Sequence, residues 1–325
     1  MPRKKEYSVE LGVSNYSYPS DGWIRRQMHE WGASGFDFYG EALKRLGISY
    51  GDIVLDVGAG MGYDGLSMAT TYRPRAVYLL EPHADEDEEG QGIVTDFDVK
   101  YYHLGIALWQ KGLTDVRLLP SADFKRFSAE IGPPAAGIQA PGITYIQPVE
   151  AVAEDIPLPD NSVSKLTMIH SAYHFSDIRQ AFSEAGRVMA PGAIGMLITN
   201  GPDDKRNFKN SLQKAGEALR NPASTTVSSR LYYPQAVEML SQDFDIVDEP
   251  LVYQDTMLID EERLPDYIWA YNSYRHFFER PIVNDGRWDA IREEVFEGPI
   301  RRAMAGNDGT ATDSIDIAAI YFRAK

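Results

Sequence analysis

An aspartate and three alternating glycines stand in the stretch Ile53-Val54-Leu55-Asp56-Val57-Gly58-Ala59-Gly60-Met61-Gly62. The apolar run before the glycines has the length of a β-strand, and an apolar pattern typical of a helix begins at Leu66. A strand, a glycine turn and a helix in this order present backbone N–H groups to a ligand at the edge of an open α/β sheet. Glycines suit the turn because a side chain would hold the ligand away from the backbone and disfavour positive φ angles.

Two classes of ligand fit this turn. Gly60, Gly62 and Gly65 have the spacing of a dinucleotide-binding turn, and Glu81 follows Gly60 by about 20 residues, as that motif requires. Asp56, however, would repel a pyrophosphate and attract an ammonium or a sulfonium group. The sequence therefore favours a cationic, zwitterionic cofactor over a dinucleotide, and a glycine turn that binds nothing is the remaining alternative.

Four segments together resemble the class I S-adenosylmethionine-dependent methyltransferases. Residues 54–62 resemble the first motif of this family, and residues 77–82 are similar to its second strand. Residues 153–162 resemble the adenine-side segment of the small-molecule (type 11-like) branch, and residues 186–192 resemble the turn before the fifth strand. The four segments follow the family's order over about residues 50–200, and no motif covers the two ends of the chain.

The resemblance implies an α/β fold with a Rossmann-like, seven-stranded, mostly parallel sheet flanked by helices. It also implies a helical N-terminal segment (residues 1–50), a methyltransferase core (51–255) and a helical lid or substrate segment that ends in the final sheet strand (256–325). Because 73 residues separate Glu81 from Glu154, we expect an insertion at about 85–145 that shapes the substrate site or makes a homo-oligomer contact.

The cofactor residues implied by the resemblance lie where the strands end, and Glu81 would hold the ribose hydroxyls. Many family members carry an acid at the position of Val152, so the adenine contact here falls to Glu154, Asp155 or another residue. The full set of predicted cofactor residues is Asp56, Gly58, Ala59, Gly60, Gly62, Glu81, Pro82, Ala153, Glu154, Asp155, His170 and Ser171.

The resemblance implies transfer of a methyl group from S-adenosylmethionine to a small molecule, such as a natural-product intermediate, by in-line displacement. A hydroxyl or acidic-carbon acceptor also needs a base, for which His174 and His103 are candidates beside their alternative role as structural side chains. Aromatic side chains of the two end segments either line the acceptor pocket or pack the core; they are Tyr16, Tyr18, Trp23, Trp269, Tyr271 and Tyr274.

The composition restricts partners and location. The 48 acids and 32 bases give a net charge of −16, which disfavours nucleic-acid and anionic-membrane partners. The chain has no cysteine, no apolar run long enough to span a bilayer and no signal-peptide pattern, so we expect a cytoplasmic protein without a metal site. The alternatives to a methyltransferase are a nicotinamide-dependent oxidoreductase and a catalytically inactive cofactor-binding scaffold.

Overall fold

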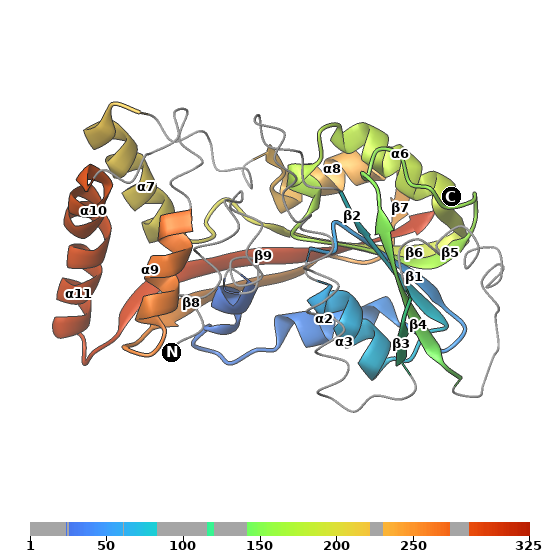
Figure 1. Cartoon of the computed structure of the whole chain (residues 1–325), viewed down its shortest axis with the longest axis horizontal. Helices are drawn as coiled ribbons and strands as arrows, with labels where there is room; N and C mark the ends of the chain where they lie inside the picture. The colour runs from blue at the N-terminus through green and yellow to red at the C-terminus, as the bar shows by residue number, and fades with distance from the viewer. Residues whose placement is uncertain are drawn as a thin grey trace.

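The computed structural model of the chain describes residues 24, 26–60, 62–82, 116–119, 142–221, 230–273 and 286–325. These residues form one nine-stranded sheet with the strand order β3-β4-β2-β1-β5-β6-β9-β7, and β8 also pairs with β9 (Figure 1). The strands are β1 (Ile53–Val57), β2 (Ala76–Glu81), β3 (Val116–Leu118), β4 (Thr144–Glu150), β5 (Val163–Ile169), β6 (Met189–Asn200), β7 (Phe244–Ile246), β8 (Leu251–Ile259) and β9 (Ala311–Ala324).

The sheet is parallel from β3 to β6 and antiparallel around β9. This arrangement confirms the expected Rossmann-like, mostly parallel sheet, with nine strands instead of seven. β3 lies within the predicted insertion, and the antiparallel β8 runs across the boundary predicted at residue 255. Since parallel strands all end at one edge, the last residues of β1, β2, β4 and β5 lie close together.

Helices cover both faces of the sheet. Figure 1 shows α2 (Phe38–Leu46) and α3 (Tyr63–Thr71) on one face, and α6 (Ile178–Val188) and α8 (Tyr233–Asp243) on the other. Side chains of β1 alternate between the two cores, because Val54 packs in the core under α2 and α3 whereas Leu55 packs in the core under α6 and α8. At Gly65, an added Cβ would come 2.1 Å from Leu79 Cδ2, so glycine allows α3 to lie close to β2.

The C-terminal helices form a lobe around the far ends of β8 and β9 (Figure 1). It contains α7 (Arg206–Leu219), α9 (Leu264–Ser273), α10 (Arg287–Arg292), the π-helix η7 (Glu293–Glu297) and α11 (Gly298–Ala305). The last three follow one another without a break between residues 287 and 305. Within the lobe Tyr271 stacks on Phe296 and Trp288. These aromatic side chains belong to the same hydrophobic core that extends under α2 and α3, and the role of the segment as a lid stays a prediction.

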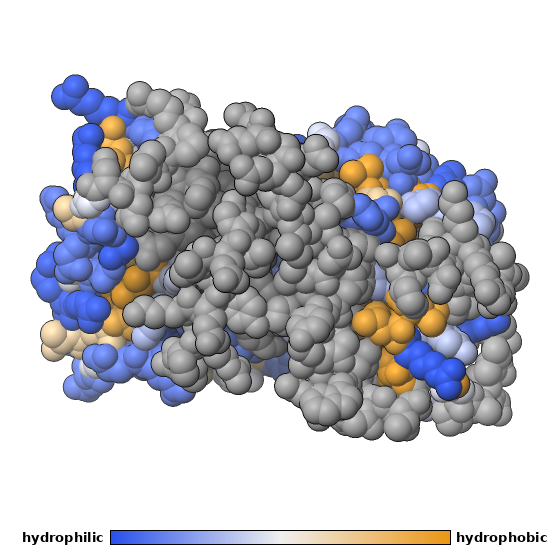
Figure 2. All heavy atoms as spheres, viewed as in Figure 1, coloured by the Kyte–Doolittle hydropathy of each residue, from blue (hydrophilic) through white to orange (hydrophobic). Residues whose placement is uncertain are grey.

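Hydrophilic residues gather at both ends of the molecule, over α10 and α11 at one end and over α6 at the other (Figure 2). None of the helices that the structure describes has the length and apolar character needed to cross a lipid bilayer. Within the same described ranges, no three acidic or histidine side chains are grouped to bind a metal ion.

Candidate active site

The glycine turn between β1 and α3 uses left-handed backbone at three positions. Gly58, Gly60 and Gly62 have φ angles of 70°, 55° and 73°. The N–H groups of Gly58 and Ala59 donate to the carbonyl of Leu80 on β2, at 2.8 and 3.0 Å. A Cβ on Gly58 would also come 2.4 Å from the Cβ of Ser171. Left-handed geometry and this close approach explain why the turn needs glycine.

Gly60 is the open point of the turn. No described atom lies within 4 Å of the position of an added Cβ at Gly60. Its N–H donates to Oε2 of Glu81 at 2.9 Å, which brings the last carboxylate of β2 next to the turn. The open backbone position at Gly60 and the carboxylate of Glu81 are placed together, as expected for a site that binds a ligand with hydroxyl donors.

Asp56 is buried beneath the turn, with 2% of its surface exposed. Its Oδ1 accepts a hydrogen bond from the hydroxyl of Thr167 at 2.7 Å. Burial, followed by the charges of Asp64 and Glu81, raises the pKa of Asp56 to about 7, although the hydrogen bond from Thr167 acts in the opposite direction. A cation bound here would favour the ionised form of Asp56, so this carboxyl suits an ammonium or sulfonium ligand.

The segment at the predicted adenine side is held by α6. Arg187 donates to the carbonyls of Ile156 and Leu158, at 2.7 and 2.9 Å, and Glu184 accepts from the N–H of Ile156 at 3.0 Å. Glu154 has another contact, because its Oε1 accepts from the N–H of Asp177 just before α6 begins, at 2.9 Å.

Ala153 is buried and Asp155 is exposed. Pro82, directly after Glu81, is exposed as well. The role of these residues in binding adenine stays a prediction.

The residues after β5 lie beside the glycine turn. The hydroxyl of Ser171 donates to the carbonyl of Val57 at 2.6 Å. His170 has a φ angle of 52°, and its N–H donates to the carbonyl of Ile198 at 2.9 Å. His174 ends the short helix η4 (Ala172–His174), is exposed and has its ring against that of Tyr173. Its role as a base also stays a prediction.

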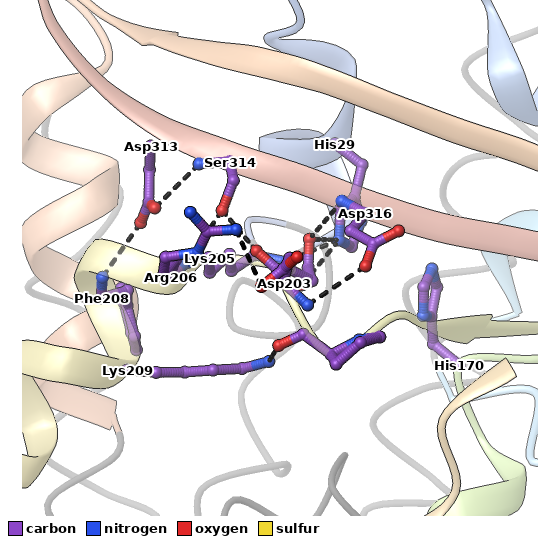
Figure 3. A network of polar contacts seen from close by, with 12 residues as sticks. His29, His170, Asp203, Lys205, Arg206, Phe208, Lys209, Asp313, Ser314 and Asp316 are labelled. Atoms are coloured by element: carbon purple, nitrogen blue, oxygen red, sulfur yellow. Dashed lines mark hydrogen bonds and ion pairs between the residues drawn. The ribbon is translucent and has the colours of Figure 1, made fainter. Parts of the chain in front are cut away.

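A polar network that the sequence did not predict lies next to His170. The hydroxyl of Tyr39 bonds Nε2 of His170 at 2.7 Å and Nδ1 of His29 at 3.0 Å. Nζ of Lys205 lies 2.6 Å from Nε2 of His29 and 2.7 Å from Oδ2 of Asp204. Figure 3 shows His29 beside Lys205 at the start of α7, with His170 at the end of the group.

The predicted acceptor-contact residues have different positions. Trp269 is half-buried and packs against the hydrophobic core that includes the C-terminal lobe and the face under α2 and α3. Tyr271 is fully buried, with 0% of its surface exposed, and its contact with an acceptor stays a prediction. The remaining candidates lie outside the described residues; they are Tyr16, Tyr18, Trp23, Tyr274 and the predicted base His103.

Comparison with known proteins identifies the domain. A family model described as "Methyltransferase domain" matches residues 132–197. The uncharacterized methyltransferase YcgJ of Bacillus subtilis (strain 168) is 32% identical over 94 residues. These matches support a class I S-adenosylmethionine-dependent methyltransferase domain in this chain. The match to YcgJ covers 28% of this chain and 36% of the relative, so the chain aligns with about a third of that relative's length.

Similar solved structures include that of YcgJ from Bacillus subtilis, with 16% identity over 88% of this chain and 96% of that chain, at a TM-score of 0.45. A SAM-dependent methyltransferase from Aquifex aeolicus has 12% identity over 94% of this chain and 98% of that chain, at a TM-score of 0.44.

The residues at the strand ends fit the cofactor of such a domain, S-adenosylmethionine. Asp56 offers a buried carboxyl to a positive group, and Glu81 offers a carboxylate that can accept from two hydroxyls. The space around an added Cβ at Gly60 is open to 4 Å among the described atoms. In a dinucleotide site, by contrast, the acids Asp56, Asp64 and Glu81 would surround a pyrophosphate with negative charge.

Proposed function

We propose that this chain transfers a methyl group from S-adenosylmethionine to a small-molecule acceptor. The observation that carries the proposal is the buried carboxyl of Asp56 beneath an open glycine turn, with the carboxylate of Glu81 beside it. The net charge of −16 also favours a small molecule over a nucleic acid as the acceptor.

The roles of the residues follow from their chemistry. Asp56 would hold the positive end of the cofactor, Glu81 its ribose hydroxyls, and Gly58 to Gly62 would let it approach the backbone. When bound, the cofactor supplies an already activated methyl group, so the protein contributes mainly by holding donor and acceptor in line. Thr167 and Ser171 position this site, because they tie the end of β5 to Asp56 and to the carbonyl of Val57.

The first experiment measures binding of S-adenosylmethionine, S-adenosylhomocysteine, NAD and NADP by isothermal titration calorimetry. We expect binding of the two adenosyl ligands alone, and a Glu81→Gln variant should bind them more weakly because a neutral amide oxygen accepts less strongly from the ribose hydroxyls than a carboxylate does. Binding of a nicotinamide cofactor alone would replace the proposal with an oxidoreductase.

The second experiment follows transfer of a radiolabelled methyl group to a panel of phenols, carboxylic acids, amines and β-dicarbonyl compounds. Labelled product from any of these small molecules supports the proposal. Tight binding of S-adenosylmethionine with no labelled product from the whole panel would favour the inactive scaffold.

A further inference from the structure

A continuous chain of polar side chains connects a buried ion pair to the edge of the proposed site. Asp204 and Lys205 form the ion pair at the start of α7, His29 follows, and Tyr39 joins His29 to His170. All of these side chains except that of His170 are buried. The two imidazole rings also stack, with 4.9 Å between their centroids and an interplanar angle of 11°.

The ammonium of Lys205 determines which atoms of this chain carry hydrogen. An ammonium can only donate, so Nε2 of His29 accepts from Lys205 at 2.6 Å. The competing contact from the same nitrogen to Asp204 is 3.4 Å, which is too long to decide the orientation. His29 is thus neutral with its hydrogen on Nδ1, and it donates to the oxygen of Tyr39 at 3.0 Å.

The same reasoning continues from Tyr39 to His170. Since the Tyr39 oxygen accepts from His29, its own hydrogen is directed to Nε2 of His170 at 2.7 Å. Neutral His170 must then carry its remaining hydrogen on Nδ1. All hydrogen bonds of the chain point in one direction, from Lys205 to His170, and this order is favourable because successive hydrogen bonds polarise one another.

The pKa shifts agree with this assignment. Burial and the nearby Lys205 lower the pKa of His29, and burial together with His29 and Lys205 lowers the pKa of His170 well below its usual value, so both rings are neutral at pH 7. Burial raises the pKa of Tyr39 well above 10 despite the opposing effect of Arg26, so its hydroxyl keeps its hydrogen. Burial also opposes ionisation of Asp204, but Lys205 and His29 together outweigh it and lower the pKa of Asp204.

His170 occupies a position suited to a functional group. It is the first residue after β5, at the edge where Asp56 and the glycine turn lie, and it is half-buried. Its φ angle of 52° is left-handed, an arrangement that costs free energy for a residue with a side chain and is found often at functional sites. Among the contacts described for this part of the chain, Nδ1 of His170 makes no hydrogen bond. This atom is also not among the fully buried polar atoms that lack a partner, so it keeps some exposed surface.

We propose that His170 donates a hydrogen bond from Nδ1 to an oxygen of the methyl acceptor, with Tyr39, His29 and Lys205 as positioning residues. The acceptor class is a compound with a phenolate, enolate or carbonyl oxygen, because a fixed N–H recognises an oxygen that can only accept. This inference rests on the proposed function. In this role His170 does not act as a base, since its one free nitrogen already carries a hydrogen.

The test begins with nuclear magnetic resonance of the protein labelled with ¹⁵N-histidine, at pH 7, with the signals of His29 and His170 assigned from single variants. We expect hydrogen on Nδ1 and none on Nε2 in both rings. In Tyr39→Phe the hydrogen of His170 should no longer be confined to Nδ1. The matched control is Tyr321→Phe, which also removes a buried hydroxyl that bonds α2, at the carbonyl of Ala42, and should leave His170 unchanged. Hydrogen on Nε2 of His170, or a charged ring, would overturn the proposal.

The second step adds a probe to the protein saturated with S-adenosylhomocysteine. We expect 4-nitrophenolate to move the Nδ1 proton signal of His170 downfield, and nitrobenzene, which lacks the anionic oxygen, to leave it in place. No response to 4-nitrophenolate at millimolar concentration would refute recognition of such an oxygen. Failure of the wild-type protein to bind S-adenosylhomocysteine would instead refute the proposed function, and the tautomer measurement would still report on the relay.

Turnover of an acceptor found in the methyl-transfer panel supplies the third readout. His170→Leu should lower kcat/KM about 10- to 100-fold, the loss expected for one hydrogen bond to a charged oxygen. Affinity for S-adenosylhomocysteine should stay the same, and an equal loss of that affinity would return His170 to the cofactor contact predicted from the sequence and overturn the proposal. His170→Asn keeps an N–H donor and tolerates left-handed backbone, so it should recover part of the activity. Equal activity of His170→Leu and wild type would contradict the proposal.

Discussion

If Asp56 holds the positive end of the cofactor, as proposed, the binding of S-adenosylmethionine depends on pH. In the unliganded protein, burial and then the charges of Asp64 and Glu81 raise the pKa of this carboxyl to about 7. Only the ionised form attracts a positive ligand, so binding has to remove a proton whenever the pH is below 7. Affinity should therefore fall as the pH decreases from 7.5 to 5.

The size of the effect follows from the two pKa values. If a bound cation returns the pKa of Asp56 to its ordinary value of about 4, the dissociation constant should be about tenfold higher at pH 6 than at pH 8, and nearly a hundredfold higher at pH 5. A difference of three pKa units corresponds to about 4 kcal/mol of coupling between ligand and proton. Above pH about 8 the α-amino group of the ligand loses its own charge, so affinity should fall again.

The assay is calorimetric titration at several pH values in buffers with different ionisation enthalpies, which also counts the protons released. Asp56→Asn should weaken binding at pH 7.5 and remove the dependence below pH 7, and its amide oxygen can still accept from Thr167. The control is Asp52→Asn. Asp52 lies just before β1 begins, at the opposite end of the strand from Asp56, and accepts a hydrogen bond from Ser164. This variant should keep the pH dependence of binding. A constant affinity from pH 5 to 7.5 in the wild type would refute this reasoning.

Two further predictions concern stability. Gly58→Ala should lower the free energy of unfolding by about 2–4 kcal/mol in urea titrations, because the new side chain adds both left-handed strain and a close contact with Ser171. Gly60→Ala adds only the strain and should cost less. An equal loss in the two variants would contradict this account. Tyr271→Phe should raise the melting temperature by the equivalent of about 1 kcal/mol, because the buried hydroxyl of Tyr271 has no partner among the described residues. Tyr267→Phe should lower the melting temperature, since the hydroxyl of Tyr267 donates to Asp313. A loss of stability in both variants would argue against an unpaired hydroxyl at Tyr271.

Local sequence signals were sufficient for the core of the fold. The apolar strand ending at Asp56, the left-handed glycines after it and Glu81 at the end of β2 are each set by neighbours in sequence or on the next strand. Such features have fixed spacings, so a single sequence can reveal them. The expected parallel sheet and the helices that flank it followed from the family that these patterns resemble.

The polar network could not be predicted, because its members have no common spacing. His29 and Tyr39 come from the N-terminal segment, His170 follows β5, and Lys205 comes from the start of α7. Only the folded sheet brings these segments together. The aromatic residues of the C-terminal lobe show the same limit, since helical spacing alone does not distinguish a core residue such as Tyr271 from one that lines a pocket.

Arg26 connects the cofactor side of the site to the network. Its guanidinium pairs with Asp64 at 2.9 Å, in the first turn of α3, and lies 4.0 Å from the centre of the Tyr39 ring. The charge of Asp64 is one of the causes that raise the pKa of Asp56, so Arg26 offsets part of the negative charge around that carboxyl. The same side chain packs on the tyrosine that orients His170. The N-terminal segment therefore contributes to both halves of the proposed site, to the charge at Asp56 and to the hydrogen-bond direction at His170.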